Sequence, residues 1–268
     1  AHPQPPAAST FPLPYEDDFN HSVPGSLPRY FADQAGSLEI TPSGQAAQVV
    51  WGNPGPLSWQ RNFDPFTTIG DASWANVTAS VEVLFPPVAD DDTGTYVGGG
   101  AGSSEARFRR RLQLQDPPDE NATSVQYATI CTRSDGPKDG NDAMAARWPY
   151  WRGYCATLTE KGELSLSAGS NRPNLPHQPP LVAPQQLEGF DRTRPVRLSM
   201  HSHGSTHRAE ATQQQVGGAN TGGEGIGGGA AVVVVATNGS FARGLIGVGS
   251  GYHPISFDHF QVGRTHEM

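Results

Sequence analysis

Short segments in which apolar and polar residues alternate constrain the fold of this chain more than any other feature. The clearest segment is residues 74–85, where every second position is apolar: Val77, Ala79, Val81, Val83 and Phe85. A period of two places one set of side chains on the buried face of a β-strand and the other on the solvent face. No segment has a sustained period of 3.6 residues with helix caps. The pattern predicts an all-β protein.

Eleven segments of this kind are separated by residues that favour turns. The expected strands are residues 48–51, 67–69, 74–85, 95–99, 126–132, 153–160, 163–168, 196–203, 231–237, 244–249 and 255–262. The 32 glycines and 24 prolines favour turns and long loops over helices. Strands of this number and length predict a jelly-roll sandwich of two antiparallel sheets with long Gly/Pro-rich loops.

The chain divides into two parts by composition. Residues 1–14 are rich in proline and are expected to form a linker, whereas residues 15–268 are expected to form one β-sandwich domain. Within that domain, residues 116–124, 133–145 and 213–229 are predicted to be loops. The first residue is not methionine, so we expect a processed or excised product.

Charge and hydropathy exclude two classes of partner. The net charge of −8 argues against nucleic acid, whose phosphates require an excess of Lys and Arg. No apolar run approaches the roughly 20 residues that a membrane-spanning helix needs. We therefore expect neither a nucleic-acid partner nor a membrane span.

The two cysteines and the glycosylation sequons indicate an oxidising compartment. Cys131 and Cys155 each lie in an expected strand, and adjacent antiparallel strands would let them form a disulfide; two free buried thiols are the alternative. Asn-x-Ser/Thr sequons occur at Asn20, Asn76, Asn121 and Asn238. Asn76 falls on the predicted solvent face of its strand. We expect a secreted or lysosomal glycoprotein.

Acidic and aromatic residues recur near the two ends of the chain. Residues 15–20 read Tyr-Glu-Asp-Asp-Phe-Asn, and residues 257–260 read Phe-Asp-His-Phe. First and last strands often pair in antiparallel sandwiches, which would bring Asp18, Asn20 and Asp258 within reach of one cation. Hard oxygen ligands of this kind suit calcium. Unrelated surface turns rich in Asp are the alternative.

The other candidate sites are less specific. His201 and His203 share one face of their expected strand, with His207 close by, at a spacing that zinc could use. Histidines that simply face solvent are the favoured interpretation. Aromatic residues on loops often stack against sugar rings, and Trp59 is the favoured candidate for this role. We find no pair of acids in a recognisable nucleophile and proton-donor context, so no catalytic residue is assigned.

Five stretches occur in an order shared with one known family: Tyr15-Glu-Asp-Asp-Phe-Asn20, Phe31-Ala-Asp-Gln-Ala-Gly36, Pro56-Leu-Ser-Trp59, Ile69-Gly-Asp-Ala-Ser-Trp74 and Phe257-Asp-His-Phe-Gln-Val262. On these stretches the chain resembles the C-terminal lectin-like domain of galactocerebrosidase, the β-galactosidase of glycoside hydrolase family 59. The resemblance covers residues 5–263. The insertions between residues 103 and 145 and the glycine-rich loop depart from the family pattern.

The resemblance implies a concanavalin-like jelly roll that packs beside a catalytic (β/α)8 barrel. It implies that Trp59 contributes to the galactose site and that Asp18, Asn20 and Asp258 hold calcium, while the two catalytic glutamates lie on the barrel outside this chain. A β-galactoside or galactolipid substrate, a saposin partner and a lysosomal location are also implied. Because a calcium ligand should not carry a glycan, we predict that Asn20 is unglycosylated.

Two functions therefore remain open from the sequence. The chain is expected to be the non-catalytic lectin-like domain or subunit of a galactocerebrosidase-like enzyme. The alternative is a free-standing carbohydrate-binding or adhesion module of an extracellular glycoprotein, because the fold alone does not decide function.

Overall fold

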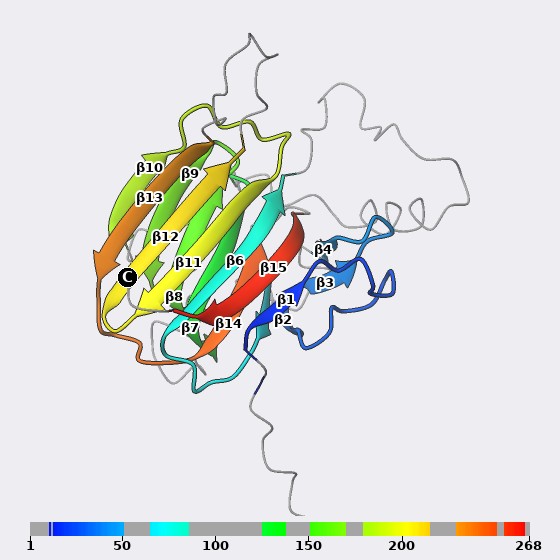
Figure 1. The fold of residues 1–268 in the computed structure, drawn as a ribbon, viewed down its shortest axis with the longest axis horizontal. Helices are drawn as coiled ribbons and strands as arrows, with labels where there is room; N and C mark the ends of the chain where they lie inside the picture. Colours follow the sequence, from blue (N-terminus) through cyan, green and yellow to red (C-terminus); the bar gives the residue numbers. More distant parts are fainter. Residues whose placement is uncertain are drawn as a thin grey trace, which may run out of the picture.

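The protein is a sandwich of two antiparallel β-sheets (Figure 1). The computed structural model describes residues 11, 13–50, 65–85, 125–137, 151–169, 179–214, 229–250 and 255–265. In this part of the chain every regular element is a strand. These described residues therefore include no helix long and apolar enough to cross a membrane. The predicted all-β class and two-sheet architecture are confirmed.

The larger sheet has eight strands in the order β13-β12-β11-β6-β15-β4-β3, with β1 paired to β15 outside this path. Its strands are β1 (Tyr15–Asp17), β3 (Ser37–Ile40), β4 (Ala46–Val50), β6 (Val77–Leu84), β11 (Val196–His203), β12 (Thr206–Gln213), β13 (Ala230–Thr237) and β15 (Ser256–Arg264). β15, the last strand in the sequence, thus lies inside the sheet between β6 and β4.

The smaller sheet has seven strands in the order β10-β9-β8-β7-β14-β5-β2. Its strands are β2 (Ala32–Ala35), β5 (Phe66–Ile69), β7 (Tyr127–Pro137), β8 (Trp151–Thr159), β9 (Glu163–Ala168), β10 (Val182–Gln186) and β14 (Leu245–Ser250). β7, β8 and β9 form consecutive antiparallel neighbours, and β14 pairs with the other side of β7.

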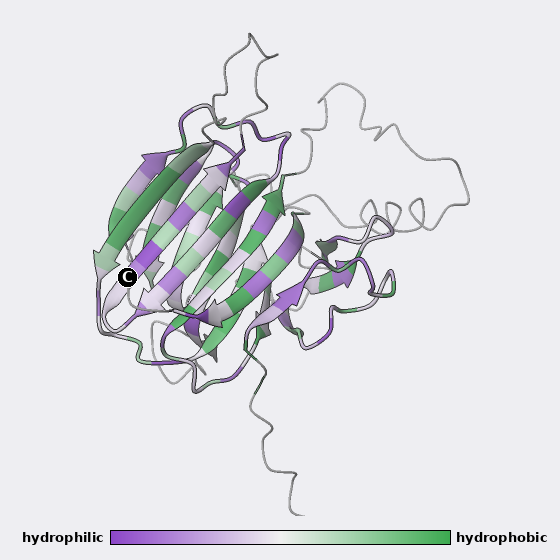
Figure 2. Cartoon of the chain, viewed as in Figure 1, coloured by the Kyte–Doolittle hydropathy of each residue, from purple (hydrophilic) through white to green (hydrophobic). Residues whose placement is uncertain are grey.

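The hydrophobic core lies between the two sheets. The alternation that predicted β6 is visible as bands of contrasting hydropathy along the strands of the larger sheet (Figure 2). All five predicted inward side chains of this segment are buried: Val77, Ala79, Val81, Val83 and Phe85. Ser80, expected on the solvent face, is also buried, and its Oγ accepts a hydrogen bond from Arg197 Nη2 at 2.7 Å.

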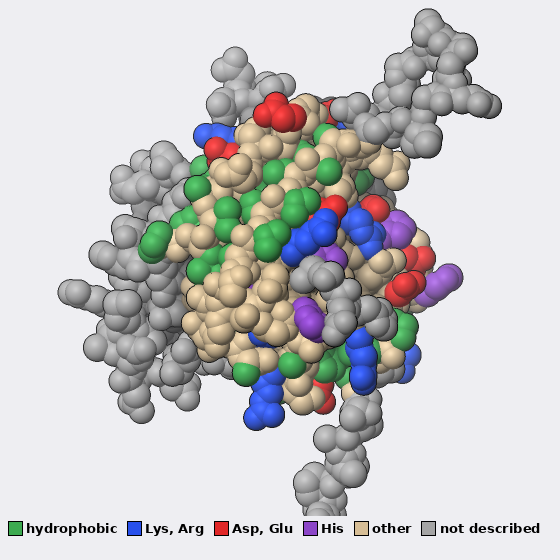
Figure 3. Space-filling view, turned by 60° about the vertical axis from the view of Figure 1, so that its left-hand side comes forward, with side chains coloured by type: hydrophobic (Ala, Val, Ile, Leu, Met, Phe, Trp, Pro, Cys, Tyr) green, Lys and Arg blue, Asp and Glu red, His purple; other side chains and the backbone are tan. Residues whose placement is uncertain are grey.

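β13 forms one edge of the larger sheet and exposes apolar side chains. Val233 and Val235 on this strand are 42% and 53% exposed. Figure 3 shows apolar side chains gathered on the face of the molecule that includes this edge. Charged residues, which commonly protect sheet edges, are absent from the eight residues of β13.

The strand predictions hold best where the alternation is regular. β9 and β11 have the predicted bounds. The loop predicted from residue 133 begins later, because β7 continues to Pro137. The strand predicted at residues 95–99 lies outside the described residues. β1, β2, β3, β10 and β12 were not among the predicted strands.

The first and last strands pair, as the residues near the two ends suggested. Tyr15 lies opposite Val262 and Asp17 opposite Phe260. Phe11 precedes β1 in the segment expected as a linker, and its ring makes edge contacts with Tyr15, Tyr30 and Trp74 at centroid distances of 5.2–5.4 Å. Together with Leu13, Phe11 packs against the main core.

Candidate functional site

The pairing of β1 with β15 brings the predicted calcium ligands to one corner of the larger sheet. Because Asp17 is opposite Phe260, Asp18 and Asp258 lie at the same end of the strand pair. The backbone bends in both segments there: Phe19 and His259 have positive φ angles of 57° and 46°. The pairing of β1 with β15 ends at Asp17 and Phe260, next to these bends.

Asp18 and Asn20 form a local hydrogen-bonded turn. The Asp18 Oδ1 accepts the backbone N–H of Asn20 at 3.2 Å. Hydrogen bonds from the Asn20 side chain and backbone lower the pKa of the Asp18 carboxyl below its usual value, and His21 and His259 add a smaller effect in the same direction. The Asp18 carboxylate is therefore ionised and exposed to solvent.

Asn20 lies close to the turn that joins β3 to β4. A Cβ atom added to Gly44 would lie 2.6 Å from Asn20 Oδ1, and the φ of Gly44 is +79°. Only glycine accommodates both this backbone conformation and this close approach. The Asn20 amide oxygen therefore lies next to Gly44.

Asp258 shares this corner with a histidine and a second acid. Its Oδ1 accepts the backbone N–H of His259 at 2.7 Å. The Nδ1 atom of His259 lies 3.3 Å from Asp258 Oδ1 and 3.5 Å from Glu82 Oε2. The corner thus holds three carboxylates, one amide and an imidazole on adjacent strands.

The donor set fits a hard cation. Carboxylates from Asp18 and Asp258 and the amide oxygen of Asn20 are the ligand types that calcium takes. The described residues contain no group of three or more His, Cys, Asp or Glu side chains placed to hold a metal. A calcium ion here would therefore depend on the Asn20 oxygen and on further backbone or water oxygens.

The three histidines considered as a zinc cluster do not converge. On β11, His201 and His203 lie on the outer face, where His201 Nδ1 is 3.0 Å from Thr78 Oγ1. On β12, His207 points to the opposite face and is fully buried. The expectation that all three face solvent is therefore wrong for His207.

His207 belongs to a polar network inside the sandwich. Its ring stacks on Tyr154 of the smaller sheet at a centroid distance of 3.4 Å. Its Nδ1 lies 2.9 Å from Ser202 Oγ, and its Nε2 lies 2.9 Å from the Asn238 carbonyl oxygen. Burial, opposed by the hydrogen bond to Asn238 and aided by the nearby Arg133 cation, lowers the pKa of His207 to about 4. The imidazole is thus neutral at physiological pH.

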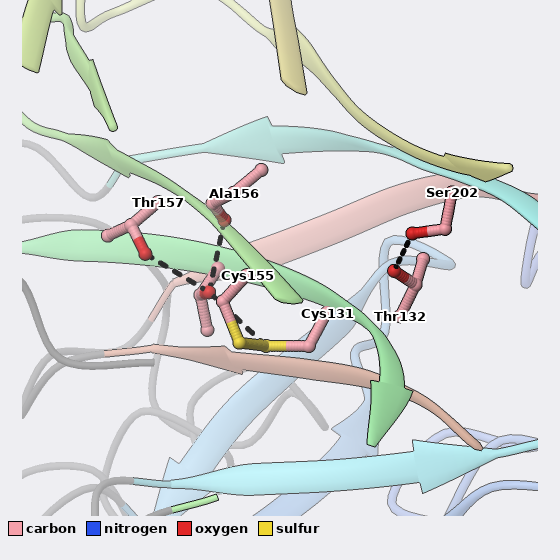
Figure 4. Close-up of a disulfide and its surroundings, with 7 residues drawn as sticks. Cys131, Thr132, Cys155, Ala156, Thr157 and Ser202 are labelled. Carbon is pink, nitrogen blue, oxygen red and sulfur yellow. Dashed lines mark hydrogen bonds between the residues drawn. A yellow bond between two sulfur atoms is a disulfide. The ribbon is translucent and has the colours of Figure 1, made fainter. Parts of the chain in front are cut away.

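The network crosses between the sheets a second time beside the disulfide (Figure 4). Ser202 Oγ on β11 lies 2.6 Å from Thr132 Oγ1 on β7. The neighbouring residue, Cys131, is joined to Cys155 by a disulfide, and the two residues are directly opposite on β7 and β8. The predicted disulfide is confirmed, and the alternative of two free thiols is excluded.

Arg133 is a buried cation that the sequence did not reveal. It is 3% exposed and has a φ of 54°, in a position expected to start a loop. Its guanidinium donates to three oxygens on other segments: Ala75 O at 2.6 Å, Phe241 O at 3.0 Å and Asn76 Oδ1 at 3.4 Å. Burial lowers the pKa of the guanidinium. Nothing in the local pattern distinguishes such an arginine from a surface residue.

A cavity of about 690 Å³ opens beside Asn76, where the two ends of the domain meet. It is lined by Phe11, Leu13, Asp71, Ser73, Trp74, Ala75, Asn76, Val77, Arg264 and Thr265. These residues could not be grouped from the sequence, because they come from three distant segments. The lining combines two aromatic rings with a carboxylate, an amide and a guanidinium.

The remaining predicted residues are placed as follows. Asn76 is exposed directly before β6, and Asn238 is partly exposed directly after β13. Trp59 and Asn121 lie outside the described residues. The structure therefore brings Asp18, Asn20 and Asp258 to one corner, and leaves the predicted sugar-binding tryptophan undescribed.

Known proteins match this chain in two ways: some share local sequence similarity with it, and others share its fold. No family model matches the chain. Over 93 residues the chain is 37% identical to galactocerebrosidase of Danio rerio, a match that takes in 31% of this chain and 14% of the relative. Over 110 residues it is 32% identical to galactocerebrosidase of Homo sapiens, covering 37% of this chain and 15% of the relative. The matches thus span about one seventh of these relatives' length.

Solved lectin structures share the fold. The lectin UEA-II complexed with galactose superimposes with a TM-score of 0.51 and 7% identity, covering 95% of this chain and 99% of the lectin. Lectin II from Ulex europaeus superimposes with a TM-score of 0.50, 6% identity and the same coverage. The chain is therefore a lectin-like β-sandwich with local sequence similarity to galactocerebrosidase.

Proposed function

We propose that this chain is the carbohydrate-binding, lectin-like domain of a β-galactosidase similar to galactocerebrosidase. The observation that carries the proposal is the local identity of 37% over 93 residues to an enzyme of that name. The lectin-like fold is consistent with it. In this proposal the substrate is a β-galactoside or galactolipid, and the catalytic glutamates lie on a (β/α)8 barrel outside the chain.

Two sites within the chain would serve that function. Trp59 would lend an aromatic face to the galactose pocket, since aromatic rings pack well against sugars. Calcium held by Asp18, Asn20 and Asp258 would fasten the loop after β1 to the bend in β15, because these residues approach through the β1–β15 pair. Calcium would supply rigidity at this corner; the chain's own residues bind and orient the sugar.

The proposal that this chain binds the sugar while a separate barrel carries out catalysis can be tested by assaying the chain with and without that barrel. We expect the isolated chain to leave a chromogenic β-galactoside intact, and co-expression with a barrel-bearing polypeptide of the same precursor to give a copurifying, active complex. Hydrolysis at enzymatic rates by the isolated chain would contradict the proposal.

Replacing Trp59 with alanine tests the sugar site. In the assembled enzyme we expect Trp59→Ala to raise KM for a galactoside by roughly tenfold, because a lost aromatic contact of about 1.4 kcal/mol has this effect, while the melting temperature stays unchanged. Tyr30→Ala, at an aromatic residue that is 46% exposed, is the matched control and should leave KM unchanged. Loss of folding in Trp59→Ala would place this residue in the core instead.

A second function is favoured by the shared fold itself. A solved lectin with the same fold is bound to galactose, so the chain would act as a free-standing carbohydrate-binding or adhesion module. Tight binding of the chain alone to a glycan array, without any copurifying barrel, would support this second function over the first.

The cellular setting also follows from the proposal. We propose a lysosomal or secreted location and lipid delivery by a saposin. We also propose that the chain carries glycans on Asn76, Asn121 and Asn238. Asn20 should be bare because it serves as a calcium ligand. Mass spectrometry of glycopeptides tests this, and an intact glycan on the Asn20 peptide would remove Asn20 from the calcium site.

A further inference from the structure

The cavity beside Asn76 has the size and lining of a small-ligand site. Its volume of about 690 Å³ lies within the range of about 300–1,000 Å³ that is usual for such sites. Trp74 and Phe11 form an aromatic corner, with ring centroids 5.4 Å apart and planes at 83°. The Trp74 ring packs directly on Gly70, where an added Cβ would lie 2.2 Å from the ring.

Polar groups complete the lining on the other sides. Asp71 Oδ1 accepts the backbone N–H of Ser73 at 2.7 Å, and this bond lowers the pKa of the Asp71 carboxyl. Arg264 and Thr265 approach from the end of β15. A surface of aromatic rings next to a carboxylate and a guanidinium is suited to a sugar that carries hydroxyl groups and an apolar acetyl group.

Asn76 combines a glycosylation sequon with a place in the cavity lining. It is the acceptor residue of an Asn-x-Thr sequon and itself lines the cavity. Its Oδ1 accepts the backbone N–H of Gly204 at 3.0 Å and a guanidinium N–H of Arg133 at 3.4 Å. Both of these bonds use the oxygen, so the amide is oriented by its carbonyl, while Nδ2 is the atom to which an N-glycan is attached.

We propose that the first N-acetylglucosamine of a glycan on Asn76 occupies this cavity and joins the two ends of the domain. The sugar would touch Phe11 and Leu13 before β1, Trp74 before β6, and Arg264 and Thr265 at the end of β15. The inference rests on glycosylation of Asn76, which belongs to the proposed function, but it does not depend on galactoside binding.

A covalently attached sugar is a ligand at high effective concentration. It would stabilise the folded state because only that state forms the cavity. A glycan on Asn238 offers a comparison within the same chain. Asn238 Oδ1 also accepts two hydrogen bonds, from Tyr154 Oη at 3.0 Å and from the Ser240 N–H at 2.8 Å, yet Asn238 is not part of the cavity lining.

The test measures how fast each glycan is released from the folded chain made in mammalian cells. Peptide:N-glycosidase must reach the first sugar, so we expect release from Asn76 to be about tenfold slower than from Asn238, equivalent to about 1.4 kcal/mol of protection. Mass spectrometry of the two peptides gives both rates in one sample. After denaturation the two rates should become equal.

Variants of the cavity lining separate a held sugar from general crowding. Arg264→Ala removes an exposed side chain and should speed release at Asn76 without changing release at Asn238. As a second readout, trimming the glycan to its first sugar should keep the melting temperature about 2–4 °C above that of unglycosylated chain made in a bacterial periplasm. The Ser240→Ala background, which lacks the Asn238 sequon, is used for both forms.

Three results would overturn the inference. One is a bare Asn76 in material whose Asn238 carries a glycan. The others are equal native release rates at the two sites, and a rate at Asn76 that Arg264→Ala leaves unchanged. If the inference fails in one of the last two ways while Asn76 is glycosylated, the proposed glycoprotein character still stands.

Discussion

At position 207 a histidine occupies an inward site of β12 where the core would normally take an apolar side chain. It is fully buried and stacks on Tyr154, while both ring nitrogens lie within hydrogen-bond distance of oxygens, one from Ser202 and one from Asn238. These partners satisfy the neutral ring but leave no counter-charge for a protonated one. A local reading of the sequence cannot find this site, because the partners come from other strands and a neighbouring loop.

The buried His207 should make folding sensitive to acid. Its pKa is about 4 in the folded protein against 6.5 for an ordinary histidine. Well above pH 6.5 the His207 imidazole is neutral in both the folded and the unfolded protein. Between pH 6.5 and 4 the unfolded chain takes up a proton that the folded chain excludes, so stability falls as the pH falls. We expect this residue to remove up to about 3 kcal/mol across that window.

Urea denaturation at several pH values measures this effect. His207→Gln stays neutral throughout, so its free energy of unfolding should fall less steeply between pH 6.5 and 4 than that of the wild type. His203→Gln, on the outer face of β11, should keep the wild-type slope. Equal slopes in the wild type and His207→Gln would contradict the pKa assignment.

At the scale of elements, strands could be predicted where large apolar residues mark the inward positions. β9 and β11 have the predicted bounds, because Leu164 and Leu166 in β9, and Val196, Leu198 and Met200 in β11, occupy those positions. β12 was not predicted because its inward positions hold no large apolar residue: they are His207, Ala209, Ala211 and Gln213. β10 was not predicted because it contains a proline and is almost wholly exposed. Pairing with neighbouring strands, rather than local composition, makes β10 and β12 strands.

The Cys131–Cys155 bond fastens two adjacent strands, β7 and β8, over a sequence separation of 24 residues. Closing a loop of that length in the unfolded chain should stabilise the protein by about 3 kcal/mol. We therefore expect the double variant Cys131→Ser/Cys155→Ser to unfold at lower urea concentration than the wild type. A reducing agent should shift the wild-type midpoint and leave that of the double variant unchanged, whereas equal midpoints for the two proteins would show that the bond contributes little.

At the scale of the whole molecule, the meeting of the two ends was foreseen from the acidic and aromatic residues near each end. The sequence could place Asp18, Asn20 and Asp258 together only through the assumption that first and last strands pair, and β1 does pair with β15. It could not foresee the Arg133 contacts or the cavity beside Asn76. Those depend on the packing of segments far apart in the sequence: the cavity lining joins residues near Phe11 to Arg264 and Thr265, and the Oγ1 atoms of Thr78 and Thr265, with a sequence separation of 187, are 3.0 Å apart.

Calcium at this corner would make the stability of the whole sandwich depend on the ion. An ion that binds only the folded state stabilises it by mass action, by about 2.7 kcal/mol when its concentration is 100 times Kd. We expect EDTA to lower the melting temperature and added calcium to restore it.

Substitution of the proposed ligands tests whether this corner is responsible. Asp18→Ala and Asp258→Ala should each abolish the response to calcium. Glu188→Gln, at an exposed acid just after β10, should retain it. A melting temperature that EDTA does not change would count against the calcium site.

The interior position of β15 has a consequence for how the protein comes into being. Until residues 256–264 have been synthesised, the hairpin of β3 and β4 and the block of β6, β11, β12 and β13 lack the strand that lies between them. Each remains as a separate fragment with an open hydrogen-bonding edge. A nascent chain stalled or truncated before this point would be a target for chaperones and proteases, and its larger sheet would close only once β15 has been made.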